Sequence, residues 1–248
     1  MERWHNKVAV VTGASSGIGA AIAKDLIENG LQVVGLARRL ERVEAIRKQL
    51  PTKMQRNLTA LPCDVSNLES VNKAFDQIIA KFGSIDILVN NAGCLILGQL
   101  VSMSVSDIQQ VLQTNVMGVV HCTQRAFTSM KERDFPGHII LINSIAGHDV
   151  KVVPGVPEHN IYSPSKFAIT AITEIYRQEF KGLDTKIKVT SISPGCVDTE
   201  ILPDNIKQLI GETMLKSQDI SSAVMYAIST PPHVQIHEMI IKPLGEMF

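Results

Sequence analysis

Tyr162 and Lys166 are the residues whose types and spacing point most directly to chemistry. They stand four positions apart at the start of an amphipathic segment at residues 161–180, and such residues lie one turn apart on the same face of a helix. A tyrosine titrates near pH ~10 in water, and a neighbouring cation lowers that pKa. The pair is therefore a candidate general acid and base. The alternative is an exposed lysine beside a half-buried tyrosine.

A second candidate site is the turn at residues 13–19, in which glycines are spaced GxxxGxG. It follows a β-branched run at residues 7–12 and precedes apolar residues at helical spacing that stop at Asn29 and Gly30. Glycine lets the backbone approach a ligand closely, and free N–H groups at a helix start suit a pyrophosphate. The turn therefore predicts a dinucleotide site, with a plain tight connection as the alternative. The expected cofactor contacts here are Gly13, Ser15, Ser16, Gly17, Ile18 and Gly19.

The ends of the next two predicted strands indicate which dinucleotide is bound. The strand at residues 31–36 is followed by Arg38 and Arg39 and by no carboxylate. Arginine accommodates the 2′-phosphate of NADP, so we expect NADP(H), with two solvated arginines as the alternative. Asp64 and Val65 follow the strand at residues 58–63. They either frame the adenine or make turn and cap interactions, and the residues alone do not separate these two possibilities.

These sites lie at the ends of strands in a chain that alternates strand and helix. Further strands are expected at residues 85–89, 138–143, 186–192 and 235–241, and helices at 40–50, 106–132, 161–180 and 220–229, with another that ends at residue 82. This order predicts an α/β fold, a doubly wound (Rossmann) parallel sheet of about seven strands with helices on both faces. A ligand then lies beyond the carboxyl ends of the strands. We expect one domain over residues 1–248, with a dinucleotide half at about 1–143 and a catalytic and substrate half at about 144–248.

The composition argues against several other classes of protein. Lys and Arg number 24, as do Asp and Glu, so no net charge favours nucleic acid or an anionic membrane. No apolar run reaches the roughly 18 residues of a membrane-spanning helix, and the polar N-terminus contains no signal-peptide core. The histidines repeat no metal-ligand spacing, so no metal site is expected. We predict a soluble cytoplasmic protein whose scattered cysteines are reduced, namely Cys63, Cys94, Cys122 and Cys196.

Taken together, the motifs resemble those of the short-chain dehydrogenase/reductase family. Four further stretches, at residues 1–4, 35–39, 129–133 and 229–236, resemble the insect NADP-dependent farnesol dehydrogenases and their vertebrate relatives that act on steroids and other carbonyl compounds. The resemblance implies an NADP(H)-dependent oxidoreductase. It rests on Thr12 to Gly19, Asn90-Asn91-Ala92-Gly93, Asn115, Ser144, Tyr162 with Lys166, and Pro194-Gly195, which occur in the family's order along essentially the whole chain.

The resemblance also implies roles for the matched residues. Tyr162 would exchange a proton with the substrate oxygen while Ser144 hydrogen-bonds that oxygen, and Lys166 would lower the pKa of the phenol and hold the nicotinamide ribose. Asn115 would anchor a water between Lys166 and solvent. Taken singly, Ser144 is also suited to capping a turn, and Asn115 to satisfying backbone groups in a helix kink. The remaining implied cofactor contacts are Asn91, Gly93, Tyr162, Lys166, Pro194, Gly195, Val197 and Thr199.

The substrate side departs from the usual family pattern. The segment between Ser144 and Tyr162 is longer than in many members. Pro164 requires the helix to begin at or just before Tyr162, because proline is tolerated only in the first turn. A lipophilic alcohol or carbonyl compound is the expected substrate, and an isoprenoid alcohol such as farnesol is the first candidate. Apolar residues near the expected pocket favour this choice: Leu95, Ile96, Leu97, Val152, Val153, Ile201 and Leu202.

Three further expectations concern partners and alternatives. Members of the family are commonly dimers or tetramers, and the apolar side chains of Ile169, Ile172 and Ile175 support a homodimer or homotetramer. A steroid or general carbonyl reductase is the nearest alternative function. A non-catalytic protein that senses NADP(H) is the alternative from a different class.

Overall fold

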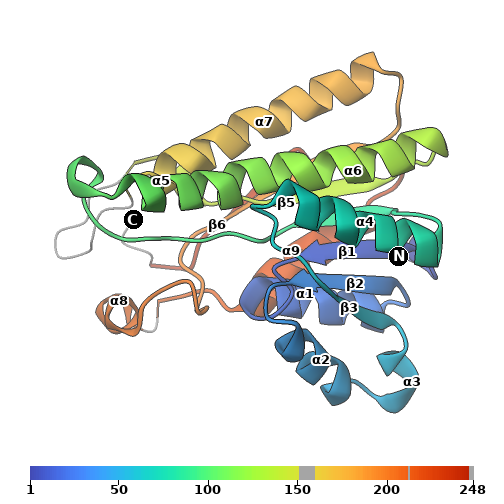
Figure 1. The fold of residues 1–248 in the computed structure, drawn as a ribbon, viewed down its shortest axis with the longest axis horizontal. Coiled ribbons are helices and arrows are strands. Elements are labelled where there is room, and N and C mark those ends of the chain that lie inside the picture. The colour runs from blue at the N-terminus through green and yellow to red at the C-terminus, as the bar shows by residue number, and fades with distance from the viewer. Residues whose placement is uncertain (151–159, 212, 246–248) are drawn as a thin grey trace.

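The computed structural model describes residues 1–150, 160–211 and 213–245. Within these ranges, seven strands form one sheet in the order β3-β2-β1-β4-β5-β6-β7, and all neighbouring strands are parallel. The predicted doubly wound parallel sheet is therefore confirmed (Figure 1). The strands are β1 (Val8–Thr12), β2 (Gln32–Ala37), β3 (Leu58–Pro62), β4 (Ile87–Asn90), β5 (His138–Ile142), β6 (Lys188–Pro194) and β7 (Glu238–Ile241).

Helices cover both faces of this sheet (Figure 1). One face carries α4 (Leu68–Phe82), α6 (Gly118–Glu132) and α7 (Tyr162–Gly182), and the other carries α1 (Gly17–Glu28), α2 (Leu40–Gln49) and α9 (Ser217–Ser229). Successive side chains of a strand point to opposite faces. In β1, Ala9 and Val11 accordingly belong to the core under α1 and α9, and Val8 and Val10 to the core under α4 and α6.

The sequence signals that delimit the helices are visible in α4. The side chain of Asn67 accepts a hydrogen bond from Ser70 N and caps the helix start, and Gly83 ends the helix in the left-handed conformation with φ 71°. Between them, Val71, Phe75 and Ile78 are buried at helical spacing. The same kind of signal ends α1, where Gly30 follows Asn29 with φ 83°, as predicted.

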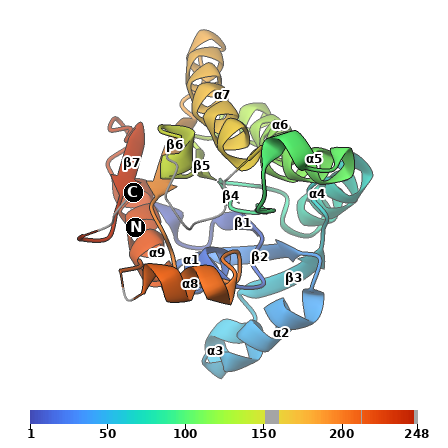
Figure 2. The same cartoon turned by 90° about the vertical axis from the view of Figure 1, so that its left-hand side faces the viewer.

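Three helical features differ from the sequence prediction. The single helix expected at residues 106–132 consists of α5 (Val105–Leu112), the π-helical turn η3 (Gln113–Met117) and α6. The short helix α3 (Thr52–Gln55) was not predicted, and α8 (Asp204–Ile210) lies in a region to which no helix was assigned. Both short helices contain too few residues for an apolar period to be recognised. Figure 2 views the side of the molecule where α5 and α8 extend beyond the sheet.

The three isoleucines expected at a subunit interface differ in their exposure. Ile169 is 1% exposed and belongs to the core of the chain itself, so its assignment to an interface is wrong. Ile172 is half-buried against the same core. Ile175 is 51% exposed and is free to contact another subunit.

Other structural features bear on the class of protein. None of the four cysteines forms a disulfide. None of the helices in the described ranges is long and apolar enough to cross a membrane. Among the same residues, no group of three or more His, Cys, Asp or Glu side chains is arranged to hold a metal ion.

His138, the first residue of β5, is fully buried and lies opposite Lys188 of β6. Its Nε2 lies 2.8 Å from Thr190 Oγ1, and because that hydroxyl donates to Ile236 O, the imidazole Nε2–H must be the donor to Thr190. Nδ1 has no hydrogen-bond partner within the described residues. Burial, together with the nearby charges of Lys188 and Arg3, lowers the pKa of His138 to about 3.

We expect His138 to make the fold sensitive to acid. Below its ordinary pKa of 6.5, the unfolded chain binds a proton that the folded chain excludes down to about pH 3, so stability is lost as the pH falls. By pH 4.5 this loss reaches roughly 3 kcal/mol. His138→Leu should remove a comparable part of the acid-induced decrease in the free energy of unfolding, as measured by urea denaturation at pH 7.5 and 4.5. Equal decreases in variant and wild type would contradict this assignment.

Candidate functional site

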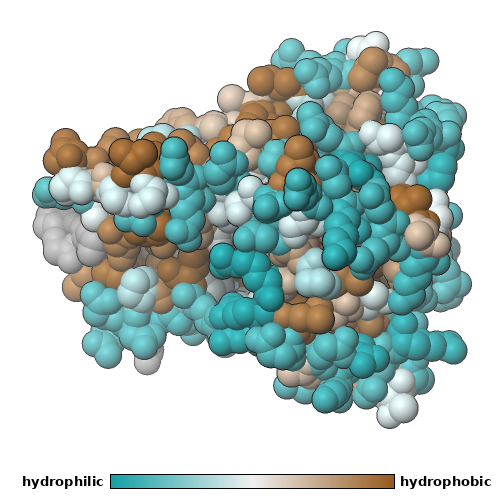
Figure 3. All heavy atoms as spheres, in the orientation of Figure 1, coloured by the Kyte–Doolittle hydropathy of each residue, from teal (hydrophilic) through white to brown (hydrophobic). Residues whose placement is uncertain are grey.

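A cleft of about 490 Å³ lies at the carboxyl ends of the strands. In Figure 3, apolar surface gathers on the side of the molecule between α5 and α8. Gly19 and Asn115 do not line the cleft and support it from behind. The predicted site residues that do line it are Gly13, Ser15, Ser16, Gly17, Ile18, Arg38, Arg39, Asp64, Val65, Asn91, Gly93, Ser144, Tyr162, Lys166, Pro194, Gly195, Val197 and Thr199.

The glycine turn forms one end of the cleft. Gly13 and Gly17 adopt φ values of 66° and 54°, in the left-handed region that favours glycine. A β-carbon at Gly13 would lie 2.8 Å from Asn91 Nδ2, and one at Gly17 would lie 3.0 Å from the methyl group of Thr199. Ser16 precedes α1 without capping it through its side chain, so the first N–H groups of α1 are suited to bind an anion.

Thr12 and Asn91 connect this turn to the end of β4. Thr12 Oγ1 accepts hydrogen bonds from Asn91 N at 2.9 Å and from Ala92 N at 3.0 Å. Asn91 Nδ2 donates to Thr12 O at 2.9 Å. The ends of β1 and β4 are therefore held together where the strand order of the sheet reverses.

Tyr162, Lys166 and Ser144 meet at the other end of the cleft. α7 begins at Tyr162, so Pro164 falls in its first turn, as its sequence position required. Lys166 Nζ donates to Ile142 O at 3.0 Å and lies 5.7 Å from the centroid of the Tyr162 ring. Ser144 is hydrogen-bonded to the side chain of Tyr162. It also accepts from Ala146 N at 3.1 Å, so it caps the following turn as well.

Burial shifts the pKa values of both titratable groups at this end. It raises the pKa of Tyr162 to about 12, and the hydrogen bond from Ser144 opposes the shift. It lowers the pKa of Lys166 to about 8. The expected lowering of the tyrosine pKa by Lys166 is therefore not seen in the protein alone, because the loss of water around the phenol outweighs the effect of nearby groups.

Asn115 lies in the π-helical turn η3 and is 2% exposed. Its Oδ1 accepts from Cys94 N at 2.8 Å, and its Nδ2 donates to Cys94 O at 2.9 Å and to Ser165 Oγ at 3.1 Å. The side chain thus satisfies backbone groups of the loop after β4 and binds that loop to α7. Its role in holding a water stays a prediction.

The residues predicted at the adenosine end occupy the expected strand ends. Asp64 Oδ1 accepts from Ser66 N at 3.0 Å and from Ser66 Oγ at 2.7 Å. Asp64 therefore makes the turn interaction that was one of its two alternatives, and it also lines the cleft. Arg38 and Arg39 are exposed at the cleft. Arg39 Nη2 donates to Ser16 Oγ at 3.3 Å.

The backbone N–H of Val197 lies outside the bridge that its neighbours form with Leu215. Val197 pairs with Leu215 in an isolated parallel bridge. The hydrogen bonds of that bridge run from Leu215 N to Cys196 O and from Asp198 N to Leu215 O. The N–H of Val197 therefore does not take part in the bridge, and the nicotinamide contact expected of it remains a prediction.

The apolar part of the cleft agrees in part with the expectation. Leu95, Ile201 and Leu202 line it, and Ile96 and Leu97 do not. Val152 and Val153 lie outside the described residues. Further apolar residues of the lining were not named from the sequence. They come from the turn after Ser144, from α8 and from β7: Ile145, Ile206, Ile210 and Ile240.

Asn160 is a positioning residue that the sequence did not single out. Its Nδ2 donates to Ile96 O at 2.6 Å and to Gly98 O at 3.2 Å, and its Oδ1 lies 3.3 Å from Tyr162 N as acceptor. Its φ is 38°, a conformation that asparagine tolerates better than most residues. An asparagine just before the start of a helix was the available signal.

We expect burial of the Lys166 ammonium to destabilise the cofactor-free protein. Its folded pKa of about 8 lies below the ordinary 10.5. The unfolded chain therefore binds more protons between these values, and stability rises with pH across that window. Lys166→Met should raise the free energy of unfolding at pH 7 by roughly 3 kcal/mol, and this gain should shrink at pH 9.5. Urea denaturation measures both, and a gain that is the same at the two pH values would contradict burial of the charge as the cause.

Comparisons with known proteins agree with this geometry. A model of the short chain dehydrogenase family matches residues 7–209. The chain is 53% identical to a farnesol dehydrogenase of Aedes aegypti over 100% of both proteins. It is 40% identical to human dehydrogenase/reductase SDR family member 11, over 100% of this chain and 98% of the human one.

Solved structures show the same fold. The chain resembles the closed form of a serine dehydrogenase complexed with NADP+, with a TM-score of 0.86, 29% identity, and coverage of 97% of this chain and 96% of that one. It also resembles an alcohol dehydrogenase from Thermococcus sibiricus complexed with 5-hydroxy-NADP, with a TM-score of 0.83, 26% identity and 97% coverage of each chain. The chain is therefore an oxidoreductase that belongs to the short-chain dehydrogenase/reductase family.

Proposed function

We propose that this protein is an NADP(H)-dependent oxidoreductase that interconverts a lipophilic alcohol and its aldehyde or ketone. The observation that carries the proposal is a single cleft with three chemically different parts. One end has a glycine turn and arginines suited to a dinucleotide, the other end has Ser144, Tyr162 and Lys166, and the adjoining wall is aliphatic.

The residues at the dinucleotide end fit the proposed cofactor. The positions of Gly13 and Gly17 leave no room for a β-carbon, and the start of α1 offers N–H groups to a pyrophosphate. Arg38 and Arg39 would meet the 2′-phosphate, Asp64 and Val65 the adenine, and Asn91 and Gly93 the ribose. All six residues line the cleft. Two structural relatives are described as complexes with NADP+ and with 5-hydroxy-NADP. When bound, the nicotinamide supplies the hydride donor or acceptor.

In this proposal, Tyr162 moves the proton. In oxidation its phenolate takes the proton of the substrate hydroxyl, and in reduction its phenol protonates the oxygen of the carbonyl group. Ser144 holds the same oxygen and stabilises the charge that develops on it. Lys166 holds the ribose hydroxyls, and its ammonium favours the phenolate of Tyr162 once the site is assembled.

The apolar wall supports a lipophilic substrate. Leu95, Ile145, Ile201, Leu202 and Ile206 line the cleft beside the catalytic end, and such side chains favour burial of a hydrocarbon chain. The relative from Aedes aegypti is named farnesol dehydrogenase. We therefore propose farnesol or a similar isoprenoid alcohol as the first substrate to test.

We further propose that the protein is a cytoplasmic homodimer or homotetramer with one domain over residues 1–248. Exposed apolar side chains of the π turn and of α7, at Met117 (38%), Phe167 (40%) and Ile175 (51%), support an interface on this side.

The test of function is NADP reduction with farnesol, followed by absorbance of the nicotinamide. Tyr162→Phe should lower kcat by about 10² to 10⁴, because it removes the proton-accepting oxygen. Tyr226→Phe is the matched control, since Tyr226 is 61% exposed on α9, and it should leave kcat unchanged. If wild type and Tyr162→Phe turn over farnesol equally, the acid-base role is wrong.

Cofactor binding without turnover of any alcohol, ketone or steroid would identify a sensor of NADP(H) instead.

Cofactor preference gives a separate prediction. Arg38→Asp should raise the KM for NADP about tenfold or more, because a charge-assisted contact to the 2′-phosphate is replaced by repulsion, and should change the KM for NAD far less. Lys48→Asp makes the same change of charge at an exposed position near the end of α2, so it controls for the general electrostatic field. Equal effects of Arg38→Asp on NADP and NAD would show that Arg38 does not meet the 2′-phosphate.

A further inference from the structure

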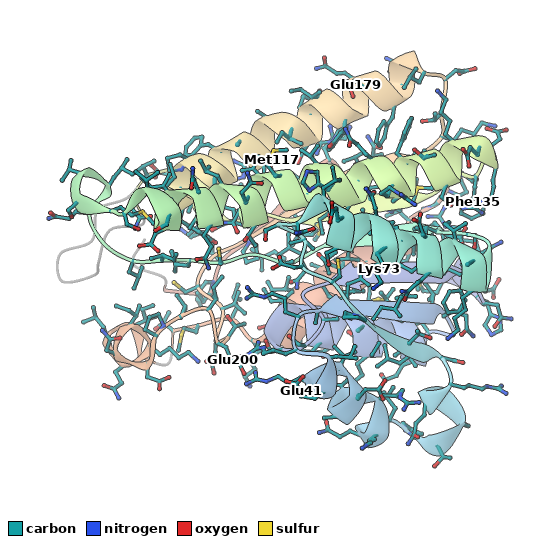
Figure 4. All side chains as sticks on the ribbon, viewed as in Figure 1. Glu41, Lys73, Met117, Phe135, Glu179 and Glu200 are labelled. Carbon is teal, nitrogen blue, oxygen red and sulfur yellow. The ribbon has the colours of Figure 1, made fainter. Side chains whose placement is uncertain are left out.

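Glu200 joins the segment after β6 to the start of α2 at the adenosine end of the cleft. It belongs to residues 197–211, a segment that we call the arm and that ends in α8. Both its oxygens contact Arg42 Nη1, at 2.6 and 2.7 Å, and Oε2 lies 3.1 Å from Arg39 Nη1. Figure 4 labels Glu200 on the arm and Glu41 on the facing first turn of α2.

Arg39 belongs to the region proposed for the 2′-phosphate, and Arg42 shares the Glu200 carboxylate with it. Arg39 directly follows Arg38 at the end of β2, lines the cleft and reaches Ser16 of the glycine turn. Arg42 lies in the first turn of α2. Guanidinium groups bind carboxylates and phosphates through the same donors, so Glu200 and a 2′-phosphate are alternative partners for the same cations.

The contact is suited to exchange. The side chains of Arg39, Arg42 and Glu200 are 46%, 43% and 54% exposed, and ion pairs at such exposure contribute little to stability. The hydrogen bond from Arg42 lowers the pKa of Glu200, followed by that from Arg39. The carboxylate is therefore ionised at neutral pH and is replaceable by an anion of higher charge.

The arm also carries part of the substrate wall. Its base is the bridge between Val197 and Leu215, and Ile201, Leu202 and Ile206 line the cleft beyond Glu200. Release of Glu200 would leave the arm attached at its base and remove one connection to α2. Glu200 thus connects the adenosine end with the segment that carries part of the substrate wall.

We propose that Glu200 is a specificity-determining residue that occupies the arginine subsite of the 2′-phosphate in the free protein and is displaced when NADP(H) binds. This inference rests on the proposed use of NADP(H). In this scheme the 2′-phosphate binds Arg39 and Arg42 and releases the arm from α2. NAD(H), which has no 2′-phosphate, leaves Glu200 paired with the two arginines.

Calorimetric titration with adenosine 2′,5′-bisphosphate and with 5′-AMP tests the inference without turnover. Glu200→Gln removes the competing charge, so it should tighten binding of the bisphosphate about three- to fivefold and leave the affinity for 5′-AMP unchanged. Glu44→Gln is the matched control, because Glu44 is an acidic residue of α2 that pairs with Arg47, and it should change neither affinity. In a variant that also carries Arg39→Ala and Arg42→Ala, Glu200→Gln should have no effect on the bisphosphate.

The outcomes separate the inference from the proposed function. If the wild type binds the bisphosphate no better than 5′-AMP, the proposed NADP(H) preference is wrong. If it prefers the bisphosphate but Glu200→Gln binds it no tighter, or tightens both ligands equally, the role of Glu200 is overturned. A weaker affinity of Glu200→Gln for both ligands would show that the carboxylate closes the cleft over a bound cofactor instead of competing with it.

Discussion

The hydrogen bonds between Thr12 and Asn91 are the interaction on which the rest of the site depends. The chain leaves β1 to form β2 and β3 on one side and returns to form β4 on the other, so a crevice opens between β1 and β4 at their carboxyl ends. Thr12 Oγ1 and the amide of Asn91 close the base of that crevice. Since Gly13 and Gly19 pack against the Asn91 side chain, larger residues there would force the glycine turn away from the sheet.

A continuous set of contacts connects this junction with the catalytic end. The loop after β4 is held at Cys94 by the amide of Asn115, whose Nδ2 donates to Ser165 Oγ. Ser165 in turn donates to Tyr162 O. The position of Tyr162 is therefore set by elements on both sides of the cleft, and the π-helical turn places Asn115 where it reaches both. Such interruptions of α-helices are common at functional sites.

The same physical cause acts on the two titratable groups of that end. Loss of water disfavours the charged forms, so burial raises the pKa of Tyr162 and lowers that of Lys166. In the proposed oxidation both groups work as ions, Tyr162 as the phenolate and Lys166 as the ammonium. The protein by itself therefore raises the free energy of both charged forms relative to water. The fold contributes the placement of Tyr162 and Lys166 more than a change in their acidity that would favour the ions.

Local patterns in the sequence were enough to predict the order of strands and helices, the glycine turn and the pairing of Tyr162 with Lys166. Each depends on residues close together in the chain, through an apolar period of 2 or 3.6, glycine at positive φ, or proline in a first turn. The sequence also indicated which side chains would gather at the carboxyl edge, since parallel strands bring their ends together. The folded structure was needed to show that Ile169 is core, that Asn115 lies in a π turn, that residues 204–210 of the cleft wall form a helix, and that Glu200 contacts Arg39 and Arg42. These features arise from contacts between residues far apart in the chain, which leave no periodic signal in the sequence.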